Sequence, residues 1–255
     1  MDRQILITIF LMVIQFNLFS LTAFGLDSGK MIQNRQEGTD PWTEARNRMV
    51  LYQIQDRGIQ DDHVLKAMKK VGRHEFVPES HKAQSYSDRP LPIGFGQTIS
   101  QPYIVALMTE LLGVDRNSKV LEVGTGSGYQ AAVLAEIADQ VYTIEIVKPL
   151  YDRSQHLLKS LGYENIHLLH GDGYFGWPGP GPYDAIIVTC ASDFIPPLLL
   201  DQLKPGGRMC IPVGPPFKVQ HLVLVQKGAS GRILTKIITS VRFVPLVRTP
   251  VPKEE

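Results

Sequence analysis

A glycine-rich turn between a short apolar stretch and an alanine-rich stretch constrains the fold more than any other feature of this sequence. Val120-Leu-Glu-Val precedes Gly124-Thr-Gly126-Ser-Gly128, and Gln130 to Ala138 follows. The apolar stretch predicts a strand and the alanine-rich stretch predicts a helix, so the glycines form a tight strand-to-helix turn. Such a turn lets a ligand approach the backbone closely where the helix begins.

Apolar strands and amphipathic helices alternate beyond this turn, which predicts an α/β fold with a mostly parallel, doubly wound sheet. Helices precede the sheet, and the last two strands predict a C-terminal antiparallel pair. The continuous apolar run 184–189 is typical of a strand buried on both faces. Strands are predicted at 119–123, 140–146, 166–169, 184–189, 209–213, 221–226 and 234–244. Helices are predicted at 42–57, 61–71, 102–112, 130–138, 151–161 and 195–203, an irregular loop between 78 and 101, and a tight turn at 204–207.

The N-terminal segment differs in composition from the rest of the chain. Residues 5–14 are almost continuously apolar after Arg3, and Ala23-Phe24-Gly25 supplies small residues at the spacing of a cleavage site. This plan is typical of a secretory signal peptide over residues 1–25. A membrane anchor and a buried core helix are the alternatives.

The domain organisation follows from these patterns. A polar linker is expected over 26–41 and a single domain over 42–255. Within that domain we expect a helical part over 42–112 and a sheet core over 119–247 that binds a cofactor.

Two classes of ligand-binding loop are excluded by residues that the glycine-rich turn lacks. No Gly-Lys-Ser/Thr ending follows, which argues against a phosphate-binding loop, and Tyr129 stands where a dinucleotide fingerprint needs glycine. Three acids remain: Glu122 in the strand, Glu145 about 20 residues further on, where a carboxylate can accept ribose hydroxyls, and Asp172, which can accept an adenine amino group. A nucleoside without a pyrophosphate, held by acids, suits S-adenosylmethionine with its positive sulfonium and ammonium groups.

Several separate motifs between Met49 and Val247 resemble the protein-L-isoaspartate O-methyltransferase family. They are Arg73-His-Glu-Phe-Val-Pro78, Leu91-Pro-Ile-Gly94, Gly96-Gln-Thr-Ile-Ser-Gln-Pro-Tyr103, Val120 to Gln130, His170-Gly-Asp-Gly173, Tyr183 to Thr189, Leu203-Lys-Pro-Gly-Gly207 and Val241-Arg-Phe-Val-Pro-Leu-Val247. The resemblance implies a Rossmann-like class I S-adenosylmethionine-dependent methyltransferase fold. The sequence departs from the family at Gly72, where many relatives have proline, at Ile146, where many have arginine, and at Cys190, where a smaller residue is usual.

The resemblance also implies an activity and a set of site residues. Family members methylate the free α-carboxylate of isoaspartyl residues in damaged proteins and peptides, and the ester closes to a succinimide that begins repair. Ser100 matches the active-site serine, and the substrate contacts implied are Ile93, Ser100, Val244 and Pro245. The cofactor contacts expected from the motifs are Gln97, Thr98, Ser100, Glu122, Gly124, Thr125, Gly126, Gly128, Glu145, Asp172, Gly173 and Thr189.

Ser100 fits this chemistry as an orienting group. A carboxylate with a reference pKa near 4 is already ionised at neutral pH, so it needs no general base. The enzyme then has to desolvate the ions and align oxygen, carbon and sulfur. A hydroxyl at Ser100 can hold the carboxylate by a charge-assisted hydrogen bond. The structural alternative is that Ser100 caps the helix beginning near Pro102.

Other functions find less support in the sequence. The 26 basic residues are balanced by 25 acidic ones, and no basic tract interleaved with aromatic residues is present, so we expect no nucleic-acid partner. The seven histidines lack ligand spacing, so we expect no metal. Cys190 and Cys210 are expected to be reduced core thiols. The alternatives kept open are a methyltransferase acting on another acceptor, such as a nucleic acid, and a binding module that holds the cofactor without turnover.

The expected compartment conflicts with the expected cofactor. Residues 1–25 predict a periplasmic, exported or membrane-tethered protein, with any membrane contact made through this segment. S-adenosylmethionine is made and kept in the cytoplasm, and a cytoplasmic location is the family default. A cytoplasm-facing anchor would reconcile the two, but Arg3 alone sets orientation poorly.

Overall fold

The computed structural model of the chain describes residues 41–249. The leader predicted over 1–25 and the linker predicted over 26–41, apart from its last residue, lie outside the described residues, as does the C-terminal end of the predicted domain.

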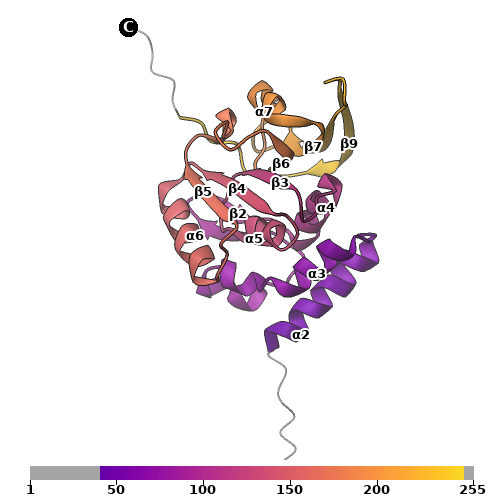
Figure 1. Ribbon diagram of the computed structural model, residues 1–255. Helices are drawn as coiled ribbons and strands as arrows, with labels where there is room; N and C mark the ends of the chain where they lie inside the picture. The colour runs from indigo at the N-terminus through magenta and orange to yellow at the C-terminus, as the bar shows by residue number, and fades with distance from the viewer. Residues whose placement is uncertain (1–40, 250–255) are drawn as a thin grey trace, which may run out of the picture. The chain divides into compact units, whose positions relative to one another are not determined.

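A seven-stranded sheet forms the centre of the described domain, with strand order β5-β4-β3-β6-β7-β8-β9 (Figure 1). The strands from β5 to β7 in this order run parallel, and β8 and β9 pair antiparallel beside β7. The predicted parallel sheet with a C-terminal antiparallel pair is confirmed. The bounds are β3 Lys119–Val123, β4 Gln140–Glu145, β5 Ile166–His170, β6 Tyr183–Val188, β7 Leu203–Val213, β8 Gln220–Lys227 and β9 Ile233–Val241.

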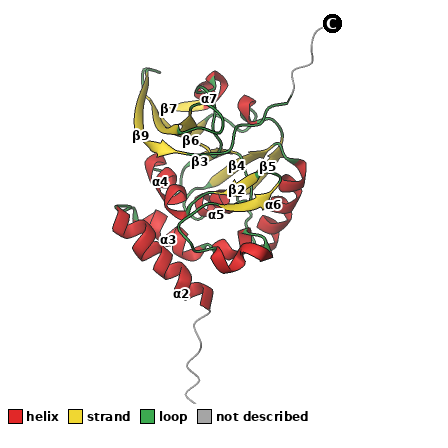
Figure 2. Cartoon of the chain, turned by 180° about the vertical axis from the view of Figure 1, so that it is seen from behind, coloured by secondary structure: helices red, strands yellow, loops and turns green. Residues whose placement is uncertain are grey.

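Helices cover both faces of the sheet, as a doubly wound fold requires (Figures 1 and 2). Leu134 and Leu158 join one hydrophobic cluster with Val120, whereas Leu199 joins a second cluster with Leu121. The neighbouring residues Val120 and Leu121 of β3 therefore pack into different clusters, which explains why both are apolar. The helices concerned are α3 Asp62–Lys70, α4 Pro102–Leu112, α5 Tyr129–Ala135 and α6 Lys148–Ser160 in the first cluster, and α7 Pro197–Gln202 in the second.

The N-terminal part is helical but not uniformly wound. The helix predicted over 42–57 is α2 Pro41–Arg48, followed by a π-helical stretch Met49–Ile54 and a 3₁₀ turn Gln55–Arg57. The spacing of hydrophobic residues predicts which residues face the core, but it does not distinguish α-helical, π-helical and 3₁₀-helical segments. Helix α3 begins as predicted, because Asp61 accepts hydrogen bonds from the backbone of His63 and Val64.

Two predictions about irregular segments were wrong. The predicted turn at 204–207 lies inside β7, where Tyr183 pairs with Leu203 but Ala185 pairs with Arg208, so the extra residues form a bulge. The segment 78–101, predicted as a loop, contains the antiparallel hairpin of β1 Leu91–Gly94 and β2 Gln97–Ile99. This hairpin matters for function because it brings 97–100 beside the glycine-rich turn. Short 3₁₀ turns complete the described chain at Arg73–Phe76, Glu79–Gln84 and Gly173–Phe175.

None of the helices found between residues 41 and 249 has the length and apolar character that crossing a membrane requires.

Candidate active site

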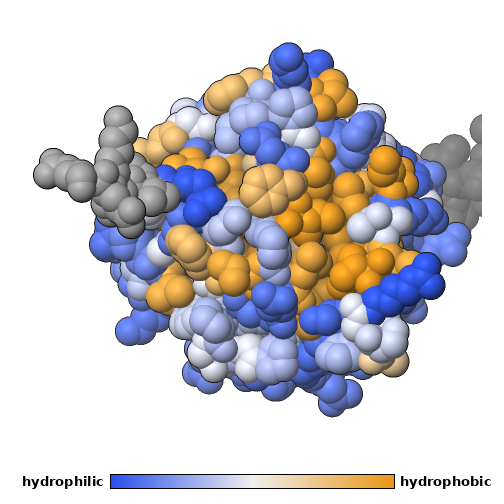
Figure 3. Space-filling view, turned by 90° about the horizontal axis from the view of Figure 1, so that it is seen from above, coloured by the Kyte–Doolittle hydropathy of each residue, from blue (hydrophilic) through white to orange (hydrophobic). Residues whose placement is uncertain are grey.

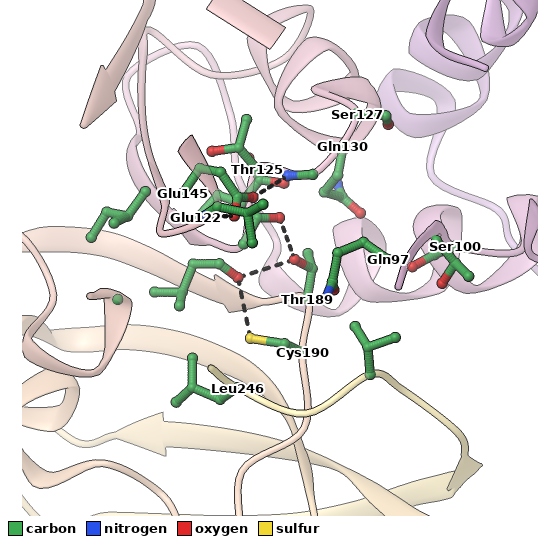
Figure 4. A pocket seen from close by; sticks show the side chains of 18 of the residues that line it. Gln97, Ser100, Glu122, Thr125, Ser127, Gln130, Glu145, Thr189, Cys190 and Leu246 are labelled. Carbon is green, nitrogen blue, oxygen red and sulfur yellow. Dashed lines mark hydrogen bonds between the residues drawn. The ribbon is translucent and has the colours of Figure 1, made fainter. Parts of the chain in front are cut away.

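One cavity lies at the carboxyl ends of β3, β4 and β6. The chain continues from β3 to β4 on one side and returns to β6 on the other, so this is the point where strand order reverses. The space is about 740 Å³, part of it open to solvent, and we call it the first cavity. Its lining, shown in part in Figure 4, is Gln97, Thr98, Ile99, Ser100, Val105, Glu122, Val123, Gly124, Thr125, Gly126, Ser127, Tyr129, Gln130, Ile144, Glu145, Ile146, Val147, Gly173, Thr189, Cys190, Val244, Pro245, Leu246 and Val247.

Gly124 occupies a position that only glycine fits. Its φ is +99°, and a Cβ there would lie 2.6 Å from Thr189 Oγ1. Thr189 uses this hydroxyl to bridge two strands, since Oγ1 lies 2.6 Å from Gly124 O and 3.0 Å from Val123 O (Figure 4). The first glycine therefore allows β3 and β6 to close together at the floor of the cavity.

Gly128 serves packing and does not line the first cavity. It precedes α5 with a φ of +87°, and a Cβ there would meet Leu158 Cδ1 at 3.2 Å. Gly128 thus allows α5 to approach α6. The sequence grouped it with the cofactor contacts because the spacing of the three glycines does not tell a ligand contact from a helix contact.

Glu145 is fixed by the backbone at the end of β4. Its Oε2 accepts a hydrogen bond of 2.7 Å from Gly126 N, and its Oε1 accepts one of 2.8 Å from Val147 N. The side chain is buried, yet it lines the cavity. Because each carboxylate oxygen has a second lone pair, both can still accept a ligand hydroxyl.

Glu122 lies deeper and belongs to a buried polar chain. Its Oε2 accepts a hydrogen bond of 2.5 Å from Thr143 Oγ1, which lies 2.6 Å from Thr125 Oγ1. Its Oε1 is buried without a hydrogen-bond partner in the described part of the chain. Burial raises the pKa of Glu122 to about 8, and the nearby Glu145 charge adds to this effect, while the bond from Thr143 opposes it. At neutral pH Glu122 is therefore mainly neutral.

Glu122→Gln is expected to weaken the pH dependence of stability. Between pH 4.5 and about 8, the folded protein keeps a proton on Glu122 that the unfolded chain has released, so native stability falls as pH rises. For the pKa values 4.5 and 8, this loss is about 4 kcal/mol across the window. Glutamine cannot ionise, so the variant lacks this contribution. Urea unfolding of both proteins at the two ends of the window measures the difference, and equal pH dependence would show that Glu122 is ionised in the native state.

Asp172 lies outside the lining of the first cavity. Its Oδ1 accepts from Tyr174 N at 3.0 Å, and its Oδ2 accepts from Arg248 Nε and from Thr249 N, both at 3.0 Å. Burial alone would raise the pKa of Asp172, but these hydrogen bonds and the Arg248 charge outweigh it and lower the pKa. Gly173 does line the cavity. The structure thus uses the acid after β5 to hold a C-terminal segment in place.

That segment, Val244 to Val247, forms one wall of the first cavity. Ala191 N donates to Val244 O at 2.8 Å, and Leu246 N donates to Ala191 O at 2.7 Å. Arg248 continues the attachment by lying 3.5 Å above the Tyr174 ring. Leu246 and Val247 were absent from the predicted site, because nothing in their sequence shows that the chain returns to β6 after β9.

A second cavity of about 900 Å³, again partly open, adjoins the first. Thr98, Ser100, Thr189 and Val244 line both spaces. Its full lining is Pro90, Thr98, Ser100, Gln101, Ile104, Thr189, Val219, Ser240, Val241, Arg242, Phe243 and Val244. The shared residues form the boundary at which a group bound in one space can meet a group bound in the other.

Ser100 does not cap α4. The cap position is Gln101, and no side chain there accepts a hydrogen bond from the first turn. Ser100 precedes it, is half-buried and lines both cavities, and Figure 4 shows it beside the first one. The hydroxyl is thus available to a ligand, which favours the orienting role over the capping alternative.

The other predicted site residues divide clearly. Gln97, Thr98, Thr125, Gly126 and Thr189 line the first cavity. Pro245 also lines the first cavity. Ile93 does not line it, because its side chain is fully buried beneath the glycine-rich turn. Its Cδ1 lies 3.4 Å from the position that a Cβ on Gly126 would take.

Several lining residues were missed by the sequence reasoning. Ser127 lies within the glycine-rich turn, and Tyr129 and Gln130 follow it directly, so their position was an available signal. Gln130 reaches α4, where its Nε2 donates to Thr109 Oγ1 at 2.9 Å.

The residues that depart from the family pattern lie partly at the site. Ile146 and Cys190 line the first cavity. Burial raises the pKa of the Cys190 thiol far above its usual value, and Cys190 and Cys210 are both unpaired. Within residues 41–249 no group of three or more histidine, cysteine, aspartate or glutamate side chains is placed to hold a metal ion.

Comparison with known proteins identifies relatives of this architecture. Residues 44–250 match the family model "Protein-L-isoaspartate(D-aspartate) O-methyltransferase". Protein-L-isoaspartate O-methyltransferase 2 of Syntrophobacter fumaroxidans is 54% identical over 216 residues, covering 81% of this chain and 87% of its own length. Protein-L-isoaspartate O-methyltransferase 1 of Nitrosospira multiformis is 59% identical over 183 residues, covering 72% of this chain and 78% of its own.

Solved structures agree with the sequence relatives. A structure of a protein-L-isoaspartate O-methyltransferase superposes with a TM-score of 0.72 at 31% identity, covering 78% of this chain and 65% of that one. A Plasmodium falciparum structure described as a beta-aspartate methyltransferase, in complex with S-adenosyl-L-homocysteine, gives a TM-score of 0.67 at 27% identity, covering 80% of this chain and 99% of that one.

Proposed function

Because this chain belongs to the protein-L-isoaspartate O-methyltransferase family, we propose that its first cavity holds the cofactor, its second holds the peptide, and Ser100 aligns the two. The enzyme transfers a methyl group from S-adenosylmethionine to the free α-carboxylate of L-isoaspartyl residues in damaged proteins and peptides. The resulting ester closes to a succinimide, which starts repair. The observation that carries the assignment of the cavities is their shared boundary of Thr98, Ser100, Thr189 and Val244.

The cofactor assignment rests on charge and hydrogen-bonding capacity. Glu145 presents two backbone-anchored carboxylate oxygens, which suit the ribose hydroxyls. Thr98, Ser100 and Thr189 at the boundary with the second cavity would face the sulfonium, and Gly124 to Gly126 would line the space for the rest of the cofactor. Gly173 lines the first cavity and would meet the adenine ring, and the neighbouring Asp172, which lies outside that lining, would offer the adenine amino group the lone pair that Tyr174 N leaves free on Oδ1.

The methyl transfer needs alignment more than acid–base catalysis. A carboxylate oxygen forms a bond to the methyl carbon as the carbon–sulfur bond breaks, and the bonding pair returns to sulfur. Bound S-adenosylmethionine would supply the methyl group and keep the electron pair on sulfur, the negative carboxylate becomes a neutral ester, and no proton has to be moved by the protein. Ser100 donates a hydrogen bond to the carboxylate and holds one of its oxygens in line with the methyl group.

Methylation of matched peptides tests this function. Protein lacking residues 1–25 is incubated with labelled S-adenosylmethionine and a peptide containing either isoaspartate or normal aspartate at one position. We expect base-labile label on the isoaspartyl peptide only, because only that peptide carries the free α-carboxylate at the required position. Bound cofactor without label on either peptide would instead support a different acceptor or a non-catalytic binding module.

We further propose that residues 1–25 direct the protein out of the cytoplasm or tether it to the membrane. The support is the order of Arg3, an apolar stretch and Ala23-Phe24-Gly25. Fractionation of cells producing the full chain and a chain lacking residues 1–25 tests it. Recovery of both proteins in the soluble cytoplasmic fraction would favour the family default.

A further inference from the structure

The second cavity contains one charged side chain. Among residues 41–249, Arg242 is the only ionisable residue in its lining. The other polar side chains that face this space are neutral: Thr98, Ser100, Gln101, Thr189 and Ser240. The absence of acidic residues in this lining leaves the cavity suited to a ligand with one negative charge.

Arg242 is held at its backbone but free at its head group. It follows the last residue of β9, and the next residue, Phe243, donates its N–H to Gln220 Oε1 at 2.9 Å. Its side chain is exposed, and among residues 41–249 its guanidinium forms no hydrogen bond or ion pair. Arg57 and Arg248, by contrast, pair with Asp88 and Asp172. Arg242 and Ser100 both line the second cavity.

We propose that Arg242 binds the isoaspartyl α-carboxylate on entry and thereby distinguishes the substrate from its methyl ester. This inference rests on the proposed function of the second cavity. The carboxylate carries one negative charge, and methyl transfer removes it. An arginine that faces no other anion attracts the substrate but loses this attraction when the product forms, so it favours exchange of ester for fresh substrate.

The two polar contacts to the carboxylate then have different kinetic effects. Arg242 sits on a long, exposed side chain and interacts most strongly with the fully charged ground state. Since the carboxylate loses charge toward the transition state, this interaction lowers KM without raising kcat. Ser100 has a short, half-buried side chain, so its hydroxyl orients the carboxylate oxygen toward the methyl group. Arg242 is therefore a specificity-determining residue, and Ser100 is the aligning one.

The test compares R242Q with the matched variant K236Q. Lys236 is an exposed cation on β9 that lines neither cavity, so K236Q removes the same charge from the same strand. The substrate is an isoaspartyl peptide with an acetylated N-terminus, an amidated C-terminus and no other charged group. In R242Q we expect KM to rise about three- to tenfold at low salt without a fall in kcat, which is typical of one exposed charge-assisted contact. K236Q should match the wild type, and raising the salt should reduce the R242Q effect.

A neutral competitor separates charge recognition from a change in cavity shape. The same peptide with a carboxamide in place of the α-carboxylate should inhibit wild type and R242Q equally. The KM of R242K for the isoaspartyl peptide should lie between the values of R242Q and the wild type. An unchanged KM in R242Q, or an equal loss of affinity for the carboxamide, would overturn the inference. If the wild type failed to methylate the isoaspartyl peptide, the proposed function itself would fail, which is a separate outcome.

Discussion

Replacing Ser100 with alanine is expected to lower kcat for the isoaspartyl peptide about a hundredfold, because a misaligned nucleophile loses that much in rate. The hydroxyl faces both cavities and is not used to cap α4. Without it the carboxylate still enters the second cavity but no longer keeps one oxygen in line with the methyl group. The Kd for S-adenosylmethionine, measured by calorimetry, should stay unchanged, because the nucleoside contacts lie elsewhere.

The Ser100 variant has two useful companions. S100T keeps a hydroxyl and should recover part of the rate. S160A removes an exposed serine hydroxyl at the end of α6 and should behave as the wild type. Wild-type kcat in the alanine variant would remove Ser100 from the mechanism and return it to a purely structural position.

The second large effect is expected at Glu145, whose replacement by alanine should raise the Kd for S-adenosylmethionine about a hundredfold. Two hydrogen bonds from ribose hydroxyls to a charged acceptor are lost, which corresponds to about 3 kcal/mol. The loop also loses its two attachments, at Gly126 N and Val147 N. Saturating cofactor should restore most of the rate, because Glu145 does not touch the reacting atoms.

Stability must be measured beside affinity for this variant. E145A is compared in urea unfolding with E164A, which removes an exposed carboxylate far along the chain from the turn. If both proteins unfold alike while only E145A binds cofactor weakly, the effect belongs to the site. Cofactor affinity equal to that of the wild type would show that another group holds the ribose.

The strands of the sheet core could be predicted from the sequence because their sequence signals are local and strong. Apolar strands such as 119–123 and glycines with positive φ such as Gly124 leave few alternatives for the backbone. The windings of 41–57 and the bulge at 204–207 depend instead on how these segments pack against distant partners, and periodicity does not contain that information.

The site was predictable to the extent that its residues follow strand ends. Glu145 and Thr189 lie where parallel strands finish, so the α/β pattern alone places them together. Asp172 also follows a strand, yet its Oδ2 accepts a hydrogen bond from Arg248, which lies far along the chain. Leu246 and Arg242 fall within the motif Val241 to Val247, but their places in the cavity linings depend on a long-range return of the chain that the sequence does not show.

The space-filling view adds a surface that sequence reasoning did not identify. Apolar residues gather across the middle of one face (Figure 3). The exposed apolar side chains of the described chain include Phe175, Phe194, Phe217 and Val247, of which Phe217 is 87% exposed and also has a positive φ of 60°. Val247 is both exposed and part of the wall of the first cavity.

The two hydrogen bonds from backbone N–H groups to the Glu145 carboxylate determine at which stage this side chain becomes ordered. Both partners are main-chain groups of the turn and of the start of α6, so the carboxylate loses its rotational freedom as the chain folds and before any nucleoside arrives. The ribose is identical in the methyl donor and in the spent thioether. A pre-organised acceptor therefore retains the two forms alike, and E145A should raise both dissociation constants by the same factor. Discrimination between fresh and spent cofactor falls to the neighbourhood of the sulfur atom alone.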